Sequence, residues 1–350
     1  MSQSNNESFA SASRPLRTLF LVTSMPVGGA EVLLVNLIRR LNRQRIEPEL
    51  CCLKELGPLG EELAEEMAHE IPTHHDLIGG KFDVAVLWRL VRLMRKRKIN
   101  AVVTVGAGDK MFWGRLAARL AGVPVICSAL HSTGWPDGVG KLNRLLTPIT
   151  DAFIGVARPH GQHLIEDEHF PAERVHVIPN GVDTNRFQPN PDAAAQLRHE
   201  MNIPSNAPVC GIVAALRPEK NHELFVETAA LVHEKLPFSH FIIVGDGPER
   251  DKIAAAIANR KLDDHVHLLG SRSDIPEVLS MLDAFMLTSH NEANPVSILE
   301  AMAVGLPVVS TNVGSIRESG EHGVTGFLAT PGNAMELADG LMTIFEDKKL

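Results

Sequence analysis

Short apolar runs alternate with longer segments of helical period along the chain from Leu16 onward. The short runs are rich in β-branched residues, and the longer segments repeat apolar residues every three or four positions. This alternation predicts βαβ units and a parallel sheet. We predict two series of strands, the first at 18–23, 49–54, 101–105, 123–130, 152–156 and 175–178 and the second at 209–216, 240–244, 266–269, 284–288 and 307–310. The expected fold class is α/β, with two Rossmann-like domains.

The chain of 350 residues is longer than one ordinary domain and suits two. Between the two series of strands lies the segment IPNGVDTNRFQP, at 178–189, whose turn residues and prolines predict a passage between domains. We place the boundary near Val182, which gives domains at 16–182 and 183–350. Residues 1–15 lack a continuous apolar run and are predicted to form a disordered tail.

The segment AFMLTSHNEANPVSILEAMA, at 284–303, carries the most specific pattern in the chain. Its apolar start predicts a buried strand, its middle a polar loop, and Pro295 the first residue of a helix that Asn294 caps and Gly305 ends. Glu292 then falls at the carboxyl end of a strand, where open α/β sheets bind ligands, and Glu300 falls inside the helix. A carboxylate can accept hydrogen bonds from two adjacent hydroxyls. As an isolated pair the two glutamates would be solvated surface groups, but the surrounding segment favours a nucleotide-sugar site.

Glu292 and Glu300, with the sequence AMAVGLPVVSTNVGS that follows them, resemble the glutamate pair of retaining glycosyltransferase family 4. The resemblance implies the GT-B fold, in which two Rossmann-like domains with parallel sheets face a central cleft. The first domain would then lie on the acceptor side, and the second would bind a nucleotide-sugar donor. It also implies that Glu292 contacts hydroxyls of the donor sugar and that Glu300 holds the ribose hydroxyls.

Two loops that follow predicted strands are similar to phosphate-binding loops of the same family. In PVGGAE, at 26–31, Gly28 and Gly29 would let backbone amides approach the donor diphosphate, although a plain turn would use the glycines equally well. In LRPEKN, at 216–221, Lys220 matches the family's phosphate-binding lysine. The family's arginine aligns with Ala215, so Arg217 either reaches the same phosphate from a shifted loop or is a solvated residue.

The resemblance assigns the remaining site residues by position. His131 opens the loop after strand 123–130 and matches a histidine that lies over the donor sugar, which makes His131, Lys220 and Glu292 the expected catalytic residues. The expected donor-binding residues also include those of loops beside the nucleotide and those at the helix start, namely Gly245, Arg272, Ser273, Asn294, Pro295 and Val296. Asp109 and Lys110 are further candidates that would face the acceptor.

The expected activity is transfer of a hexosyl group from a UDP- or GDP-linked sugar to a hydroxyl of a glycan or lipid-linked acceptor, with retention, in polysaccharide or glycoconjugate biosynthesis. Neither a metal nor a cofactor is implied. A sugar-nucleotide isomerase and a catalytically silent nucleotide-sugar-binding protein stay open as alternatives. Family members usually continue past a helix like 335–347 with a helix that crosses back onto the first domain, and that final crossover helix is expected to be absent here.

The composition of the chain argues against two kinds of partner, nucleic acids and metal ions. The net charge of −8 gives no general footprint for nucleic acid. The four cysteines have no zinc-binding spacing, and the pairs His74–His75 and His160–His163 lack a third ligand, so no metal site is expected.

The chain offers no uninterrupted run of eighteen apolar residues and no secretory signal, so a cytoplasmic location is expected. The segment from Leu87 to Lys98, LWRLVRLMRKRK, has apolar residues at helical spacing, and six of its twelve residues are basic. This pattern is typical of a helix with one face on a sheet and the other in water. It also fits a peripheral contact with the inner face of an anionic membrane.

Overall fold

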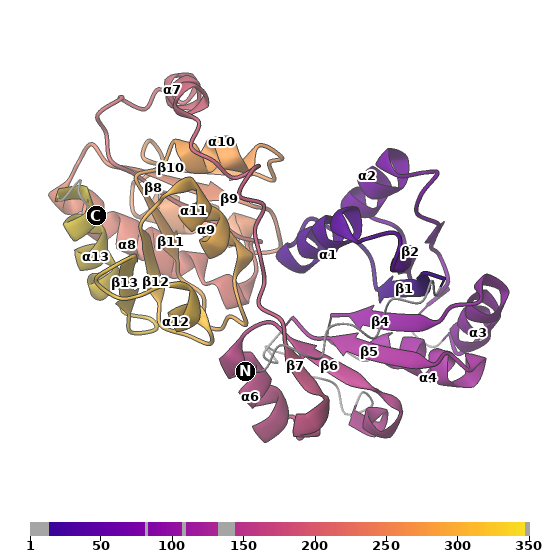
Figure 1. Cartoon of the computed structure of the whole chain (residues 1–350). Coiled ribbons are helices and arrows are strands. Elements are labelled where there is room, and N and C mark those ends of the chain that lie inside the picture. The colour runs from indigo at the N-terminus through magenta and orange to yellow at the C-terminus, as the bar shows by residue number, and fades with distance from the viewer. Residues whose placement is uncertain (1–13, 81–82, 107–109, 132–143, 347–350) are drawn as a thin grey trace, which may run out of the picture. The chain divides into compact units, whose positions relative to one another are not determined.

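The computed structural model describes residues 14–80, 83–106, 110–131 and 144–346, and these form two parallel β-sheets with helices packed on them (Figure 1). The expected α/β class with two Rossmann-like sheets is confirmed. The described helices include none that is long and apolar enough to cross a membrane. Most of the expected tail, up to residue 13, lies outside the described part of the chain.

The first sheet has the strand order β3-β2-β1-β4-β5-β6-β7. Its strands are β1 (Leu16–Val22), β2 (Ile46–Cys52), β3 (Thr73–His74), β4 (Ala101–Val105), β5 (Val125–Ala129), β6 (Ala152–Gly155) and β7 (Val175–Val177). The helices that alternate with them are α1 (Gly29–Arg40), α2 (Pro58–Glu66), α3 (Val86–Arg97), α4 (Lys110–Ala121) and α6 (Arg158–Glu166). Side chains of β1 enter two different apolar clusters. Leu19 and Leu21 belong to one cluster, and Phe20 and Val22 belong to the other. Such a strand is buried on both faces, as parallel sheets require.

The second sheet has the order β10-β9-β8-β11-β12-β13. Its strands are β8 (Val209–Val213), β9 (His240–Val244), β10 (Val266–Gly270), β11 (Ala284–Leu287), β12 (Val308–Thr311) and β13 (Gly326–Ala329). Its helices are α7 (Pro191–Glu200), α8 (His222–Lys235), α9 (Arg250–Asn259), α10 (Ile275–Ser280), α11 (Val296–Val304), α12 (Ile316–Ser319) and α13 (Ala334–Glu346). Because β8 pairs with β9 on one side and β11 on the other, the order of the strands reverses at β8.

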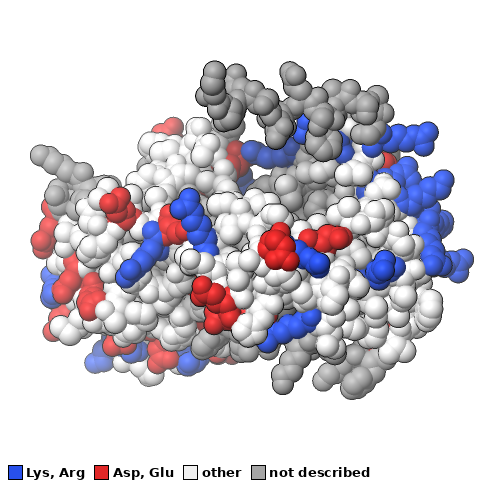
Figure 2. Space-filling view, turned by 60° about the horizontal axis from the view of Figure 1, so that its bottom comes forward, with Lys and Arg blue, Asp and Glu red and all other residues white. Residues whose placement is uncertain are grey.

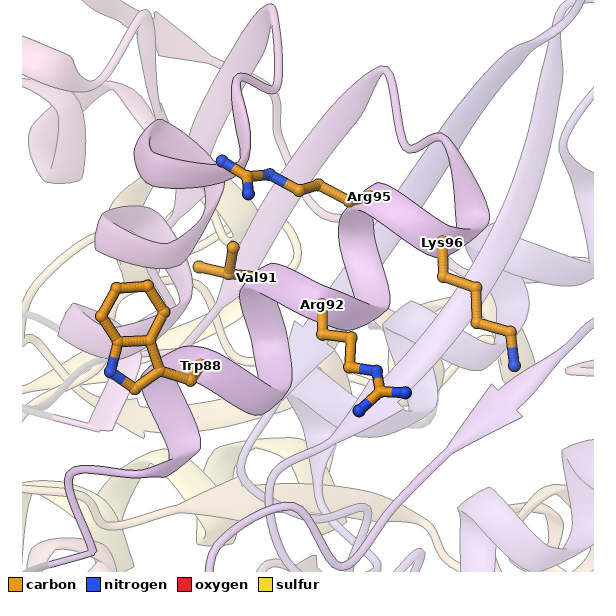
Figure 3. A pocket seen from close by; sticks show the side chains of 5 residues that line it. All are labelled: Trp88, Val91, Arg92, Arg95 and Lys96. Atoms are coloured by element: carbon orange, nitrogen blue, oxygen red, sulfur yellow. The ribbon is translucent and has the colours of Figure 1, made fainter.

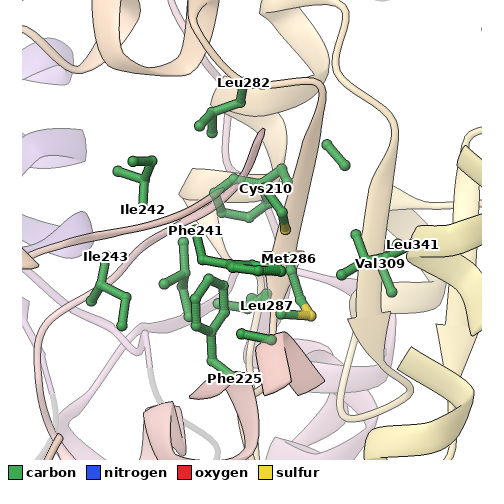
Figure 4. Close-up of a cluster of buried hydrophobic side chains, with 14 of the residues drawn as sticks. Cys210, Phe225, Phe241, Ile242, Ile243, Leu282, Met286, Leu287, Val309 and Leu341 are labelled. Carbon is green, nitrogen blue, oxygen red and sulfur yellow. The ribbon is translucent and has the colours of Figure 1, made fainter. Parts of the chain in front are cut away.

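The core of the second sheet is built from strands and from the helices on both of its faces (Figure 4). Phe225 of α8 packs edge to face on Phe241 of β9, with ring centroids 6.3 Å apart. Cys210 of β8, Met286 of β11 and Leu341 of α13 are also fully buried in this cluster. Close packing of this kind gives the loops at the strand ends a rigid base.

Every predicted strand is present, with ends that differ by a few residues, whereas β3 and β13 were not predicted. β3 consists of Thr73 and His74 alone, which is too short for a hydrophobic period. β13 is four residues long and starts at Gly326, where an added Cβ would lie 1.8 Å from the carbonyl oxygen of Val308. Its pairing with β12 is a long-range contact, and the local pattern contains no sign of it.

Contacts between residues divide the chain differently from the sheets. One compact unit ends at Ile154 and the other continues from Gly155, so α6 and β7 group with the second sheet by contacts while β7 is the edge strand of the first. The boundary near Val182 lies between the last strand of one sheet and the first strand of the other, and it stays a prediction.

Candidate functional site

The candidate site lies at the carboxyl ends of β8 and β11. These two strands are neighbours in the sheet. The chain continues from β8 to β9 and β10 on one side and from β11 to β12 and β13 on the other, so the loops that leave β8 and β11 run in opposite directions. Ligands of open α/β sheets bind at such a switch point. The loop after β8 contains Lys220 at the end of a short 3₁₀ turn, Pro218–Lys220, and the loop after β11 contains Glu292.

Lys220 and Glu292 form a close ion pair in this site. The Nζ of Lys220 lies 2.6 Å from Oε1 of Glu292, and the hydroxyl of Ser289 donates to the same oxygen at 2.6 Å. Glu292 is only 7% exposed. A buried carboxylate needs such donors to compensate for lost hydration. The structure therefore brings together two of the three predicted catalytic residues and adds Ser289, which the sequence placed in the loop without a role.

Backbone contacts hold the two loops against each other. The hydroxyl of Thr288 lies 3.1 Å from the carbonyl oxygen of Lys220 and 3.0 Å from that of Asn221, and the amide of His290 donates to the carbonyl of Glu219 at 2.9 Å. Asn221 has φ +51°, a left-handed conformation that asparagine tolerates and that turns the chain into α8. The position of Lys220 is thus set by the neighbouring strand as well as by its own loop.

Gly314 supports Glu292 from the segment that follows β12. Its φ is +52°, and a Cβ there would lie 1.7 Å from the carbonyl oxygen of Glu292. The amide of Ser315 donates to that oxygen at 3.3 Å. Sequence reasoning assigned no role to Gly314, because only the tertiary structure shows which backbone it approaches.

Glu300 lies inside α11, as predicted, and most of its side chain is buried. Burial raises the pKa of Glu300 to about 7, and the nearby charge of Arg186 opposes that rise. Arg186 also donates to the carbonyl oxygen of Ser273 at 3.4 Å. Glu300, Arg186 and Ser273 thus lie in one neighbourhood, which holds two of the predicted donor-binding residues.

The start of α11 differs from the prediction. The helix begins at Val296, Pro295 occupies the N-cap position, and no side chain caps the helix. The Nδ2 of Asn294 instead donates to the carbonyl oxygen of Val156 at 2.7 Å, and the carbonyl of Asn294 accepts from Asn180 at 2.8 Å. Asn294 was therefore wrong as a cap. Its Oδ1, the atom that a cap would use, has no hydrogen-bond partner among the described residues, while Nδ2 and the backbone carbonyl contact residues far away in the sequence. The predicted end of the helix at Gly305 is confirmed, with φ +90° at that residue.

The guanidinium of Arg217 does not lie on the Lys220–Glu292 pair in the described structure. Its side chain is 58% exposed, and Nη1 lies 4.0 Å from Oε1 of Glu219. The amide of Arg217 donates to the carbonyl of Ala215 at 2.8 Å, within a tight turn. Whether Arg217 replaces the arginine expected at position 215 stays a prediction.

Two glycines let the loop after β9 pack directly on the loop after β8. A Cβ on Gly245 would lie 2.0 Å from the carbonyl oxygen of Ala214, and one on Gly247 would lie 2.5 Å from that of Leu216. The amide of Leu216 donates to the carbonyl of Asp246 at 3.0 Å. Gly245 thus lies beside the site and allows the loop after β9 to approach the loop after β8 closely.

Arg272 is already engaged by its own loop. Its Nε donates to Asp274 Oδ1 at 2.8 Å, and its Nη2 contacts the other carboxylate oxygen. The guanidinium is therefore held in place at the start of α10, and the backbone around Arg272 and Ser273 follows β10 as the sequence predicted.

The predicted residues of the first sheet also lie at strand ends. Gly28 precedes α1, and its carbonyl accepts from Val32 at 2.9 Å, while Gly29 is the first residue of that helix. His131 follows β5 and is partly exposed, yet burial of its ring lowers its pKa to about 4, which keeps it neutral near pH 7. Asp109 lies outside the described residues.

His222 is a residue near the site that sequence reasoning missed. It is 2% exposed, and neither ring nitrogen has a hydrogen-bond partner among the described residues. Burial, together with the positive charge of Lys220, lowers the pKa of His222 to about 4. Its position directly after Asn221 was the one available signal, and that signal does not distinguish it from a core residue.

The described residues include no group of three or more His, Cys, Asp or Glu side chains that could hold a metal ion. His160 accepts from the amide of Val156 at 3.2 Å, and His74 lies 2.9 Å from Glu49. The cysteines are free thiols, and burial raises the pKa of Cys52 to about 12.

Two protein families match the chain. Residues 27–186 match the family described as glycosyltransferase family 4, and residues 194–350 match the glycosyl transferases of group 1. The first match covers β2 to β7 of the first sheet, and the second covers every strand of the second sheet.

Individual proteins agree with the family matches. The chain is 30% identical over 322 residues to the UDP-Gal:α-D-GlcNAc-diphosphoundecaprenol α-1,3-galactosyltransferase of Escherichia coli, covering 89% of this chain and 83% of that enzyme. It is 25% identical over 278 residues to N-acetyl-α-D-glucosaminyl L-malate synthase of Bacillus anthracis, covering 77% and 71%. The crystal structure of HepE from Anabaena in complex with UDP and glucose superposes with a TM-score of 0.83 at 26% identity, covering 95% of this chain and 91% of that one.

Proposed function

We propose that the carboxyl end of the second sheet binds a nucleoside diphosphate sugar, because this chain belongs to glycosyltransferase family 4, within the glycosyl transferases of group 1. The chain is therefore an enzyme of glycosyl transfer. The observation that carries the proposal is the contact between Lys220 and Glu292 at the switch point of that sheet. The contact supports the proposal because a cation can bind a diphosphate and a carboxylate can accept hydrogen bonds from sugar hydroxyls.

The reaction exchanges one bond at the anomeric carbon. The bond from that carbon to the diphosphate oxygen breaks, a bond to the acceptor oxygen forms with retention, and the acceptor proton leaves with the diphosphate. Negative charge grows on the departing phosphate, and Lys220 is placed to stabilise it without a metal ion. Glu292, held by Ser289, orients the sugar through its hydroxyls.

The other predicted residues take roles around this pair. Glu300 accepts hydrogen bonds from the ribose hydroxyls, and His131 lies near the sugar as a neutral imidazole. The loops that contain Gly28, Gly29, Gly245, Arg272 and Ser273 border the nucleotide, with the amides at the start of α11 and Arg217 as further contacts to the diphosphate.

We propose a UDP-linked hexose as the donor, in preference to a GDP-linked one. The HepE structure contains UDP and glucose, and the Escherichia coli relative is named for UDP-galactose. That relative is also named for a diphosphoundecaprenol acceptor. The proposed acceptor is a glycan or a lipid-linked molecule, and the proposed pathway is polysaccharide or glycoconjugate biosynthesis. The proposed location is the cytoplasm, with a contact to the inner membrane face through the segment from Leu87 to Lys98.

Exposed side chains of α3 support the proposed membrane contact. Trp88, Arg92, Arg95 and Lys96 are exposed and, with Val91, line an open hollow of about 510 Å³ (Figure 3). Lys and Arg side chains gather on the right of Figure 2, the side on which Figure 1 places α3 and α4. A tryptophan beside cations suits the headgroup region of an anionic membrane.

The test is release of nucleoside diphosphate from a panel of UDP-, GDP- and ADP-hexoses, with and without an extract of lipid-linked and soluble glycans. Release that depends on the acceptor is expected with one UDP-hexose. Lys220→Met should lower kcat by about 100-fold to 1,000-fold, as removal of a single transition-state donor does. Glu292→Gln keeps the shape of the side chain and should raise the donor KM as well.

Lys252→Met is the matched control, because Lys252 is an exposed lysine of α9 that pairs with Glu249 at 3.3 Å. It should leave both constants within about twofold, since surface ion pairs contribute little. Donor-dependent release that is equal in the Lys220→Met variant and the control would contradict the proposed roles.

A further inference from the structure

Four histidines lie together at the amino-terminal ends of β9 and β10, which are neighbours in the second sheet (Figure 1). His233 lies near the end of α8, and His240 is the first residue of β9. His265 directly precedes β10, and His267 is the second residue of that strand. We call these four residues the histidine cluster. The loops beside the proposed donor site leave the opposite, carboxyl ends of the same strands, so the proposed function uses none of the four.

The rings of the histidine cluster contact one another. The ring centroids of His233 and His265 are 4.1 Å apart, and those of His240 and His265 are 5.1 Å apart. His240 also stacks on His267, with centroids 5.4 Å apart, and its Nδ1 lies 3.1 Å from Nε2 of His267. A positive charge on one ring therefore acts on its neighbours at short range.

The contact between His240 and His267 is a hydrogen bond only while at least one of the two rings is neutral. A neutral imidazole has one N–H and one nitrogen that accepts, whereas an imidazolium has N–H on both nitrogens. When both rings are charged, the two nitrogens that lie 3.1 Å apart each carry a hydrogen. The hydrogen bond is then replaced by a repulsion between like charges.

Burial adds to the cost of charging the cluster. His240 is only 8% exposed, and Nδ1 of His233 is buried with no hydrogen-bond partner among the described residues. Burial first, and then the other three histidines and Arg198, lower the pKa of His240 to about 4. Burial, followed by the charge of His265, also lowers the pKa of His267 and that of His233. His233, His240 and His267 are therefore neutral at pH 7.

The charged groups that face the cluster do little to stabilise a proton on it. Arg198 of α7 brings a positive charge near His240, and its guanidinium is paired with Asp283 at 2.9 Å. The carboxylate of Asp264 acts to raise the pKa of His267, but Asp264 is exposed, where solvent screens its charge. Within the described ranges of the chain, no ion pair joins a carboxylate to any of the four rings.

We infer that the histidine cluster is a proton-sensitive switch, which joins the ends of α8, β9 and β10 at neutral pH and releases them on acidification. In the closed form His240 is bonded to His267 and the rings stack. Acid adds protons to buried rings that have no carboxylate partner, and the like charges drive the strand ends apart. The loops after β9 and β10 border the proposed nucleotide site, so release should also weaken donor binding, a consequence that rests on the proposed function.

The size of the effect follows from the linkage between protons and opening. The open form gains protons near the ordinary histidine pKa of 6.5, whereas His240 in the closed form gains them only near 4. The open form therefore binds more protons, and the closed form loses stability as the pH falls between these values. Through His240 alone, the open population should rise about 20-fold between pH 7 and pH 5.

Amide hydrogen exchange of the full chain at pH 7 and pH 5, corrected for the intrinsic effect of pH on exchange, measures the opening. The amide of Phe241 is the reporter, because it donates to the carbonyl oxygen of His265 at 2.7 Å. Its exchange should become about 20-fold faster at pH 5, while the amides of β1 in the first sheet should not respond.

The double variant His240→Gln, His267→Gln removes the titrating pair and should abolish the acid response of the Phe241 amide. The matched control is His69→Gln, His176→Gln, which makes the same change at two exposed histidines and should keep the response. An equal response in the double variant, or its loss in the control, would overturn the inference.

A second measurement keeps the inference testable if the double variant fails to fold. The ring of His240 should titrate near pH 4 to 5 by NMR in the unchanged protein, and His233→Gln should raise that pKa because one nearby positive charge is removed. Titration of His240 near 6.5 in the folded protein would show that the cluster does not resist protons, and the switch would be excluded.

UDP binding separates this inference from the proposed function. At pH 7 the double variant should bind UDP like the unchanged protein, and below pH 6 its affinity should fall less steeply. In Lys220→Met, UDP binding should weaken while the acid response of the Phe241 amide persists. UDP binding without any acid response would overturn the switch alone, and an acid response without UDP binding at any pH would overturn the proposed function alone.

Discussion

Most of the side chain of Glu300 is buried, and this burial raises the pKa of its carboxyl group to about 7 against the opposing charge of Arg186. In the unfolded chain the same carboxyl titrates near its ordinary value. Folding therefore favours the protonated form, and the stability of the fold falls as pH rises between the two pKa values. In the proposed role of Glu300, its ionised carboxylate destabilises the ligand-free fold until ribose hydroxyls bind to it.

Glu300→Gln is expected to stabilise the ligand-free protein at alkaline pH. The gain in the free energy of unfolding should reach about 3 kcal/mol near pH 8 and shrink to about 1 kcal/mol near pH 5.5, where Glu300 is largely protonated in the fold. Urea unfolding of both proteins at the two pH values measures it. The same variant should bind the donor more weakly, while the affinity of the unchanged protein should rise with pH through about 7.

A gain of Glu300→Gln that does not depend on pH would contradict this account of Glu300. So would a variant that is less stable than the unchanged protein at both pH values, because the carboxylate would then be stabilised by partners and not strained by burial.

At the scale of elements, the site is a set of loops that hold one another. The loop after β11 receives Gly314 against the carbonyl oxygen of Glu292, and the loop after β8 receives Gly245 against that of Ala214. A Cβ at either glycine would lie 2.0 Å or less from a backbone oxygen, so neither loop can keep its place beside an alanine. The position of each loop thus depends on the segment that follows the neighbouring strand, β12 for the loop after β11 and β9 for the loop after β8.

Gly314→Ala should therefore move Glu292 and reduce transfer. We expect kcat/KM to fall by about 100-fold, as small displacements of positioning groups do, and stability to fall by about 1–3 kcal/mol. Steady-state kinetics and urea unfolding measure the two effects. Gly332→Ala is the matched control, because Gly332 has a comparable φ of +80° but nothing within 4 Å of an added Cβ.

The control should show the backbone strain without the loss of activity. Equal activity in Gly314→Ala and Gly332→Ala would mean that the position of Glu292 does not depend on Gly314.

At the scale of the whole molecule, most of the proposed donor contacts lie in the unit that contains the second sheet. Lys220, Glu292 and Glu300 all belong to the unit that continues from Gly155. A ligand that binds only the folded form stabilises the part that it binds. The donor nucleotide should therefore affect the two sheets unequally.

UDP at about 100 times its Kd should stabilise the second sheet by about 2.7 kcal/mol. Amide hydrogen exchange should slow in β8, β9, β11 and β12, while β2 and β3 should exchange at their ligand-free rates. Lys220→Met at the same UDP concentration serves as the control and should show less protection. Equal slowing in both sheets would place the nucleotide elsewhere.

Much of this architecture could be predicted from local pattern. The strands at 101–105 and 240–244 were predicted to the residue, because dense apolar runs bounded by polar segments leave little choice of strand ends. The end of α11 at Gly305 followed from the conformational freedom of glycine. The cap was wrong because the side chain of Asn294 donates through Nδ2 to Val156, far away in the sequence, and its Oδ1 accepts from no helix amide.

The sequence by itself determined the two parallel sheets, the family, which loops carry Lys220 and Glu292, and which helix carries Glu300, because those features depend on hydrophobic period and on the local order of residues. Only the tertiary structure decided that Lys220 contacts Glu292 at 2.6 Å, that Gly314 supports it, and that burial raises the pKa of Glu300 to about 7. Distances across strands and the loss of water around a side chain arise from packing. A linear pattern records neither, because both depend on residues that lie far apart in the chain.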